Sequence, residues 1–138
     1  MSEIEINIPG VPIAKKRPRF ARRGKFVTTY NSQETEEGRW LLGVRESFRK
    51  NGITEPLNVP IGLWMIFYMP IPKSATKKQL EAIREHPKHT KKPDIDNLQK
   101  FALDCLNGEL FTDDALVWSI NAFKAYHEKP GTYIKVSW

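Results

Sequence analysis

The most apolar segment of the chain, residues 57–69 (LNVPIGLWMIFYM), constrains the fold more than any other feature. It is shorter than the roughly 18 apolar residues that a membrane-spanning helix needs. Its second half is rich in aromatic and β-branched residues and is followed by Pro70 and Pro72, which favours a strand over a helix. We therefore expect a central or interface strand in a globular domain, and no membrane span.

Residue periodicity predicts the other elements around this strand. Isoleucines alternate with polar residues at positions 4, 6 and 8, which is typical of a half-buried strand. Apolar residues at helical spacing and capping residues predict three helices, and two closing strands follow. The expected helices cover 32–50, 77–86 and 97–107, the closing strands 115–126 and 132–138, and the basic stretch 14–28 is expected to be a loop or loose hairpin.

The order β-α-β-α-α-β-β predicts an α/β (α+β) fold in which helices cover a mixed sheet. A chain of 138 residues is the size of one domain. We therefore expect a single domain over residues 1–138.

Basic residues are concentrated in two segments. The chain has 22 lysines and arginines against 16 acidic residues, and its isoelectric point is about 9.5. Residues 15–25 contain seven bases and no acid, and residues 73–92 contain seven bases and two glutamates. Such clusters indicate an anionic partner, nucleic acid first. The residues predicted to bind DNA are Lys15, Lys16, Arg17, Arg19, Arg22, Arg23, Lys25, Lys88, Lys91 and Lys92.

The single cysteine and the N-terminal sequence exclude other classes. Cys105 cannot form an intrachain disulfide or an all-cysteine zinc site, and its place on an apolar helix face predicts a core residue. The first ten residues carry acids and no apolar stretch, unlike a secretory signal. We therefore expect a cytoplasmic location.

Every aspartate of the chain lies between residues 94 and 114, whereas every acid outside this segment is a glutamate. Asp94 and Asp96 form an Asp-x-Asp motif after Pro93, and we expect the motif to be extended, with both carboxylates on one side. The helix 97–107 would be about 16 Å long. The seven residues that follow can span about 23–25 Å, so they can return Asp113 or Asp114 to the start of the helix.

Three converging carboxylates without histidine or cysteine suit Mg²⁺, with Mn²⁺ as a possible substitute. Lys100 follows Asp96 by about one helical turn, where it can contact a scissile phosphate or the charge that develops during transfer. Other interpretations remain open at this point. Asp96 can serve only as a helix cap, Asp113 and Asp114 only as a turn, and Lys100 only as a surface partner of Asp104.

Histidines and aromatic residues also have two interpretations each. His86 and His89 lie in a basic loop, where we expect surface positions rather than phosphate contacts. Trp64, Phe67 and Tyr68 are expected in the core or an interface. Phe20 and Phe26, inside the basic stretch, are better candidates for stacking on bases.

The stretch KPDIDNLQKFALDCLNGELFTDDALV (Lys92–Val117) closely resembles the sequence pattern of the RusA family of Holliday junction resolvases. The shared elements are D-x-D-N-L-x-K at a helix start, a later D-A/C-L, and D-D before a strand. About nine constrained positions at fixed spacing seldom coincide by chance.

The resemblance implies a RusA-like fold and a homodimeric, Mg²⁺-dependent endonuclease that nicks four-way DNA junctions symmetrically. Such proteins are common in phages and prophages, which implies a bacterial or phage-infected cell. Asp94, Asp96 and Asp114 match the family's catalytic carboxylates, Lys100 its catalytic lysine, and Asp113 the second acid of the pair. The segment 73–92 is longer than in compact members, so its DNA contacts do not carry over.

Two alternatives accompany this hypothesis. The first is a nucleic-acid-binding protein without catalytic activity that carries an acidic turn. The second is a related nuclease that acts on flaps or other branched DNA. Apolar residues in the segment 63–69 can serve as the dimer interface, although burial in the core explains their character equally well.

Overall fold

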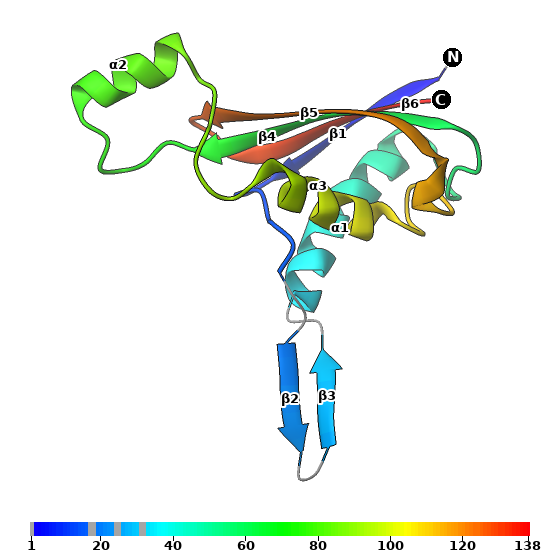
Figure 1. Cartoon of the computed structure of the whole chain (residues 1–138). Coiled ribbons are helices and arrows are strands. Elements are labelled where there is room, and N and C mark those ends of the chain that lie inside the picture. The colour runs from blue at the N-terminus through cyan, green and yellow to red at the C-terminus, as the bar shows by residue number, and fades with distance from the viewer. Residues whose placement is uncertain (1, 17–18, 24–25, 31–32) are drawn as a thin grey trace.

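The computed structural model describes residues 2–16, 19–23, 26–30 and 33–138, and of residues 19–23 and 26–30 the backbone alone. The elements follow the order expected from the sequence, and of the two forms expected for the basic stretch the structure has the hairpin (Figure 1). In chain order they are β1 (Glu3–Pro9), β2 (Arg19–Arg23), β3 (Phe26–Tyr30), α1 (Glu34–Lys50), β4 (Ile61–Pro70), α2 (Lys77–Glu85), α3 (Ile95–Leu106), a short 3₁₀ turn (Asp114–Leu116), β5 (Val117–His127) and β6 (Gly131–Ser137).

Four strands form a mixed sheet in the order β1-β6-β4-β5. The pairs β1–β6 and β6–β4 are antiparallel, whereas β4 and β5 are parallel. The parallel pair requires a long crossover, and the chain supplies it through α2 and α3. The mixed α+β fold predicted from the element order is thereby confirmed.

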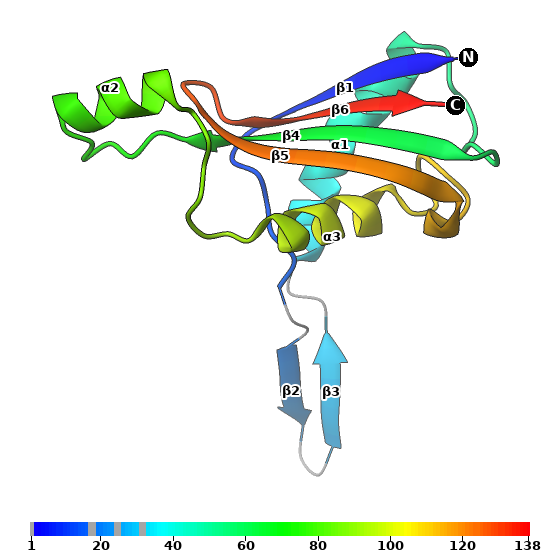
Figure 2. The same cartoon turned by 45° about the horizontal axis from the view of Figure 1, so that its top comes forward.

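Strand β4 lies inside the sheet, as the apolar segment predicts, and its side chains alternate between the two faces. Leu63, Met65 and Phe67 are buried, whereas Trp64 is 40% exposed. Helix α1 packs against β1 and α3 against β5, both on the face that carries the buried side chains (Figure 2). The other face of the sheet has no helix over its centre in this view.

Local signals explain where the helices begin. Thr76 and Gln79 form the predicted capping box of α2, since each side chain binds the other's backbone amide. Helix α3 starts at Ile95, two residues before the predicted start. Its core-facing residues follow the helical spacing and are buried: Leu98, Phe101, Ala102, Cys105 and Leu106.

The basic stretch forms a two-stranded antiparallel hairpin, β2–β3, that extends away from the sheet (Figure 1). Its root is fixed by Gln33, which is 1% exposed. The Gln33 amide accepts a hydrogen bond from the Lys16 backbone at 2.7 Å and donates one to the Ala14 carbonyl at 2.7 Å. The backbone amide of Lys15 also donates to the carbonyl of Asn97, at 2.9 Å. The hairpin is therefore attached to the first turn of α3.

Candidate active site

Asp94 occupies the N-cap position of α3 in extended backbone (φ −68°, ψ 144°), but its side chain makes no capping hydrogen bond. Its carboxylate instead accepts a hydrogen bond from the Lys92 ammonium at 2.8 Å. This contact lowers the pKa of Asp94, and the charge of Lys124 acts in the same direction. Asp94 is therefore an exposed, ionised carboxylate at the positive end of a helix.

Asp96 lies within the first turn of α3, so the predicted extended Asp-x-Asp conformation is wrong beyond Asp94. The error has a local cause. A proline restricts the residue before it, which here is Lys92, and leaves the residues after it free to enter a helix. Asp96 nevertheless remains near the same cation, because its charge also raises the pKa of Lys92. The two carboxylates thus flank one lysine at the start of α3.

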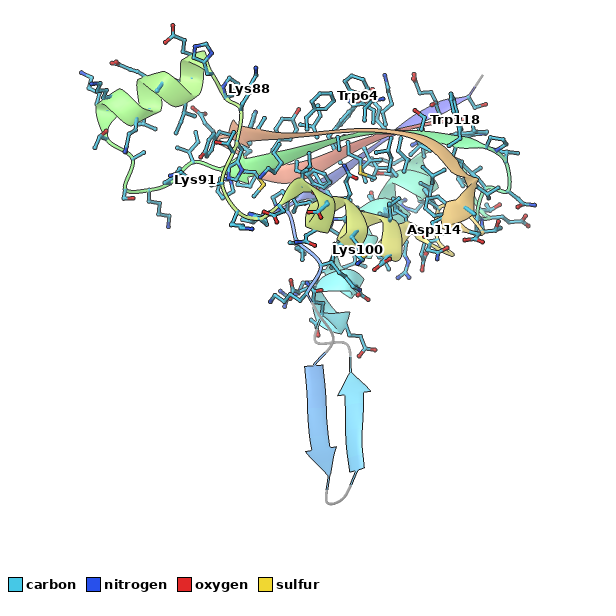
Figure 3. The ribbon with its side chains drawn as sticks, viewed as in Figure 1. Trp64, Lys88, Lys91, Lys100, Asp114 and Trp118 are labelled. Atoms are coloured by element: carbon cyan, nitrogen blue, oxygen red, sulfur yellow. The ribbon has the colours of Figure 1, made fainter. Side chains whose placement is uncertain are left out.

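The exposed face of α3 carries Asp96, Lys100 and Asp104, which are spaced four residues apart and lie along one side of a helix. Asp104 forms an ion pair with Lys15 at 3.2 Å, which supports a structural role at the hairpin root. Lys100 lies midway along this face (Figure 3). The helix therefore presents a lysine between acidic groups toward the solvent.

Asp113 and Asp114 lie near the opposite end of α3, so the predicted return of this segment to Asp94 is wrong. Residues between the helix and Asp113 are retained by the core: Leu110 and Phe111 are fully buried. The segment is also bonded to Leu57, which donates to the Leu110 carbonyl at 2.7 Å. Since α3 has 12 residues, it separates the two acidic groups by about 18 Å of helix. The apolar residues Leu110 and Phe111 hold the chain at the far end, a constraint that spacing along the chain does not include.

Asp113 caps the 3₁₀ turn, because its carboxylate accepts a hydrogen bond from the Ala115 amide at 3.3 Å. Asp113 therefore takes part in the predicted turn. A side-chain contact with Asp113 raises the pKa of Asp114, to which desolvation and the charges of Asp113 and Asp104 add. Two carboxylates at this end of α3 therefore lie close enough to repel each other and to favour a bound cation.

The acidic side chains form two pairs at the ends of α3 rather than one cluster. Within residues 2–16 and 33–138, whose side chains the structure describes, no three histidine, cysteine or carboxylate groups are placed to hold one metal ion. Exposed oxygen donors in pairs nevertheless fit Mg²⁺, which binds proteins through one or two carboxylates and takes its other ligands from water and phosphate. The carboxylate oxygens of each pair are therefore suitable ligands for Mg²⁺. Among the described side chains, however, three carboxylates do not meet at one ion.

The predicted DNA-binding residues occupy two regions. Lys88, Lys91 and Lys92 are exposed on the connection between α2 and α3 (Figure 3). Lys15 is partly buried between Glu37 and Asp104, and Lys16 lies 3.8 Å from Glu36. The side chains of Arg17, Arg19, Arg22, Arg23 and Lys25, and those of Phe20 and Phe26, lie outside the described part of the chain.

Histidine 89 is a further correction, because it is buried with 9% of its surface exposed rather than on the surface. Its ring packs on that of Tyr126 at 4.7 Å, and burial lowers its pKa. Cys105 is a core residue, as predicted, and burial raises the pKa of its thiol to about 12. Neither group is suited to act as an acid, base or nucleophile at the surface of α3.

A residue that sequence reasoning missed is Lys124 in β5. It occupies a position on the helix-covered side of an alternating strand, next to Ala122 and Tyr126. Its ammonium donates hydrogen bonds to the carbonyls of Lys91 and Pro93, at 2.6 and 2.7 Å. A lysine among inward-facing apolar residues is the signal that could have revealed it, since such a charge needs partners.

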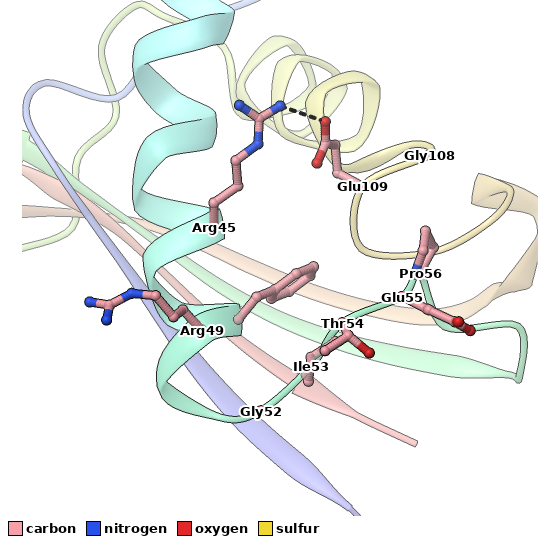
Figure 4. Close-up of a pocket in the computed structure, with 10 residues that line it drawn as sticks. Arg45, Arg49, Gly52, Ile53, Thr54, Glu55, Pro56, Gly108 and Glu109 are labelled. Carbon is pink, nitrogen blue, oxygen red and sulfur yellow. Dashed lines mark hydrogen bonds and ion pairs between the residues drawn. The ribbon is translucent and has the colours of Figure 1, made fainter.

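A hollow of about 480 Å³ lies between the C-terminal end of α1 and the turn after α3 (Figure 4). Phe48, Ile53 and Pro56 line it, and the Arg45–Glu109 ion pair, at 2.8 Å, bridges its two sides. None of the predicted site residues contributes to it. The hollow is therefore separate from the predicted site residues.

Comparison with known proteins decides the family. The family model of the endodeoxyribonuclease RusA matches residues 9–137, nearly the whole chain. The chain belongs to the RusA endodeoxyribonuclease family. It is also 29% identical over 140 residues to the protein YqaN of Bacillus subtilis (strain 168), and the alignment covers 99% of this chain and 96% of YqaN.

Membership of the RusA family confirms the resemblance of residues 92–117 and extends it to almost the full chain. It implies a nuclease that resolves Holliday junctions, with branched DNA as its substrate. Within the described residues, no helix has the length and apolar character needed to span a membrane.

Proposed function

We propose that this RusA-family chain resolves four-way DNA junctions as a homodimer, by paired, Mg²⁺-dependent hydrolysis of phosphodiester bonds. The observation that carries the proposal is the exposed face of α3, on which Lys100 follows the Asp94–Asp96 pair at the helix start, while the Asp113–Asp114 pair lies in the 3₁₀ turn beyond the other end. In a RusA-family endonuclease, such a face offers oxygen ligands for a cation and a lysine for a phosphate.

Each residue on this face has a role in the proposal. Asp94 and Asp96 would offer ligands for Mg²⁺ at the start of α3, and Asp114, with support from Asp113, would offer a separate ligand position beyond the other end; Mn²⁺ can substitute. An ion held by these carboxylates would supply an activated water and would neutralise charge on the phosphate. Lys100 contacts the scissile phosphate, and the free amides at the start of α3 favour the same anion.

The test is a cleavage assay on a synthetic four-way junction, with both nicks mapped, alongside flap and duplex substrates at matched salt. We expect two symmetrically placed nicks with Mg²⁺, and none with EDTA. Binding without cleavage under any divalent ion would instead identify a DNA-binding protein that does not cut. Preferential cutting of the flap would identify a nuclease for other branched DNA.

The reaction and the open face of the sheet support the proposed homodimer. Two paired nicks require two identical sites, which a two-fold dimer supplies. The even-numbered residues of β4 point away from the helices, and Trp64 packs on Phe123 at 5.0 Å, while Trp118 is 76% exposed. Figure 3 shows Trp64 and Trp118 on the face opposite α1 and α3. We assign the dimer interface to this aromatic patch, Trp64, Trp118 and Phe123.

Replacing two of these aromatic residues is expected to weaken the dimer. For the double variant Trp64→Ser/Trp118→Ser, sedimentation should show a dissociation constant raised at least about 30-fold, since a buried aromatic anchor contributes about 2 kcal/mol or more. Leu42→Ser is the matched control, because Leu42 is 64% exposed on α1 and outside the patch. Equal dimer affinity in the double variant and the control would remove the patch as the interface.

A further inference from the structure

We propose that Lys124 is a positioning residue that fixes the segment 87–93 and thereby sets the location of Asp94 and Asp96. The inference rests on the proposed function, because it gives those two carboxylates their role. Lys124 itself belongs to β5 and is distant in sequence from the acidic residues. Its action is exerted through the backbone that leads into α3.

Lys124 binds the backbone on both sides of Lys92, the residue that precedes Pro93. Its ammonium donates to the carbonyl of Lys91 at 2.6 Å and to the carbonyl of Pro93 at 2.7 Å. Asp94 follows the second carbonyl directly. Two charge-assisted hydrogen bonds of this length hold a backbone more firmly than neutral ones.

The same segment is attached to β5 at its other end. The Tyr126 amide donates to the carbonyl of Pro87 at 2.7 Å, and the His89 amide donates to the carbonyl of Lys124 at 3.1 Å. The buried His89 ring packs on Tyr126. Together these contacts make residues 87–93 a strap that continues the sheet edge beyond β5, and Lys124 closes its end nearest the acids.

Chemistry at Lys124 explains why the position carries a lysine. A partly buried ammonium is costly unless its donors are satisfied, and here two carbonyls accept hydrogen bonds from the ammonium. Those carbonyls in turn would lose their partner if the ammonium were removed. Residues that hold metal ligands in place affect activity by about 10- to 100-fold, although they never touch the substrate.

Three variants test the inference: Lys124→Met removes the ammonium at similar length, Lys124→Arg retains donors, and Lys129→Met removes the same charge from an exposed residue after β5. Cleavage of saturating junction should slow about 10- to 100-fold in Lys124→Met. Junction affinity measured in EDTA should stay within about twofold of that of Lys129→Met, and Lys124→Arg should recover part of the rate. Thermal unfolding establishes that each variant is folded.

Hydrogen exchange gives a readout that does not depend on cleavage. The His89 and Tyr126 amides should exchange at least about tenfold faster in Lys124→Met, because the strap opens locally, while amides within β4 keep their protection. If these two amides exchange at the same rate in Lys124→Met as in the wild type, the strap is overturned, whether or not the wild type cleaves a junction. If the wild type cleaves no junction, that result counts against the proposed function and not against the strap. A normal cleavage rate in Lys124→Met overturns the positioning role. The positioning role is also overturned if the slope of log junction affinity against log salt falls by about one unit in Lys124→Met, because Lys124 would then be a phosphate contact.

Discussion

Asp94→Asn and Asp114→Asn are each expected to abolish junction cleavage while leaving junction binding intact. The amide keeps the size of the side chain but removes the charge that a cation needs. Loss of a direct ligand should lower the rate by more than about 100-fold, the upper range for partners that only support ligands. The measurement is single-turnover cleavage with Mg²⁺, with affinity for the same junction determined in EDTA.

The matched control is Glu46→Gln, which also converts an exposed carboxylate to an amide. Glu46 lies on α1 and pairs with Arg49 at 2.8 Å, away from the acidic face of α3. Its cleavage rate should stay within a few-fold of the wild type. If both aspartate variants cut as fast as this control, the acidic face is not the active site.

Testing both aspartates separately matters because they lie at opposite ends of α3. If Asp114→Asn retains its rate while Asp94→Asn does not, the reacting phosphate lies at the start of the helix alone. If both lose it, the two acidic pairs act on the same reaction. Lys100→Met adds a third position, midway between them, and should lower the rate without removing a metal ligand.

The individual strands and helices could be predicted because short-range sequence patterns determine which residues are buried and where an element begins. Alternation of Ile4, Ile6 and Ile8 determines which face of β1 is buried, and all three are buried. The capping box of Thr76 and Gln79 sets the start of α2. By contrast, the sheet order and the parallel pairing of β4 and β5 depend on contacts between distant residues, which local patterns do not encode.

The candidate site was predictable as a set of residues but not as an arrangement. The Asp-x-Asp motif, Lys100 and the Asp113–Asp114 pair were all found from type and spacing. The separation of the two acidic pairs could not be predicted. The maximum reach of the chain gives only the largest distance that residues 108–114 can span, whereas burial of Leu110 and Phe111 determines where this segment lies. Lys124 was missed for a related reason, since its partners are backbone carbonyls that no sequence motif marks.

Removing the four arginines Arg17, Arg19, Arg22 and Arg23 is expected to weaken junction binding at every DNA sequence and to flatten its dependence on salt. Each lost phosphate contact should reduce the slope of log affinity against log salt by about 0.9, or up to about 3.6 for all four. Binding titrations at several salt concentrations provide the measurement. Cleavage at saturating enzyme should change little, because the arginines are assigned to DNA contact and not to the reaction.

A charge-matched control distinguishes the hairpin from a general effect of net charge. Replacing Lys73, Lys77, Lys78 and Arg84, which are exposed in and near α2, also removes four positive charges. If the hairpin contacts DNA, this control should keep a steeper salt dependence than the arginine variant. Equal slopes in the two variants would mean that overall charge attracts the DNA, and an unchanged slope in the arginine variant would exclude the hairpin as a DNA contact. Because the hairpin root is bonded to Asn97 in the first turn of α3, a DNA contact there would place the bound strand beside the acidic face.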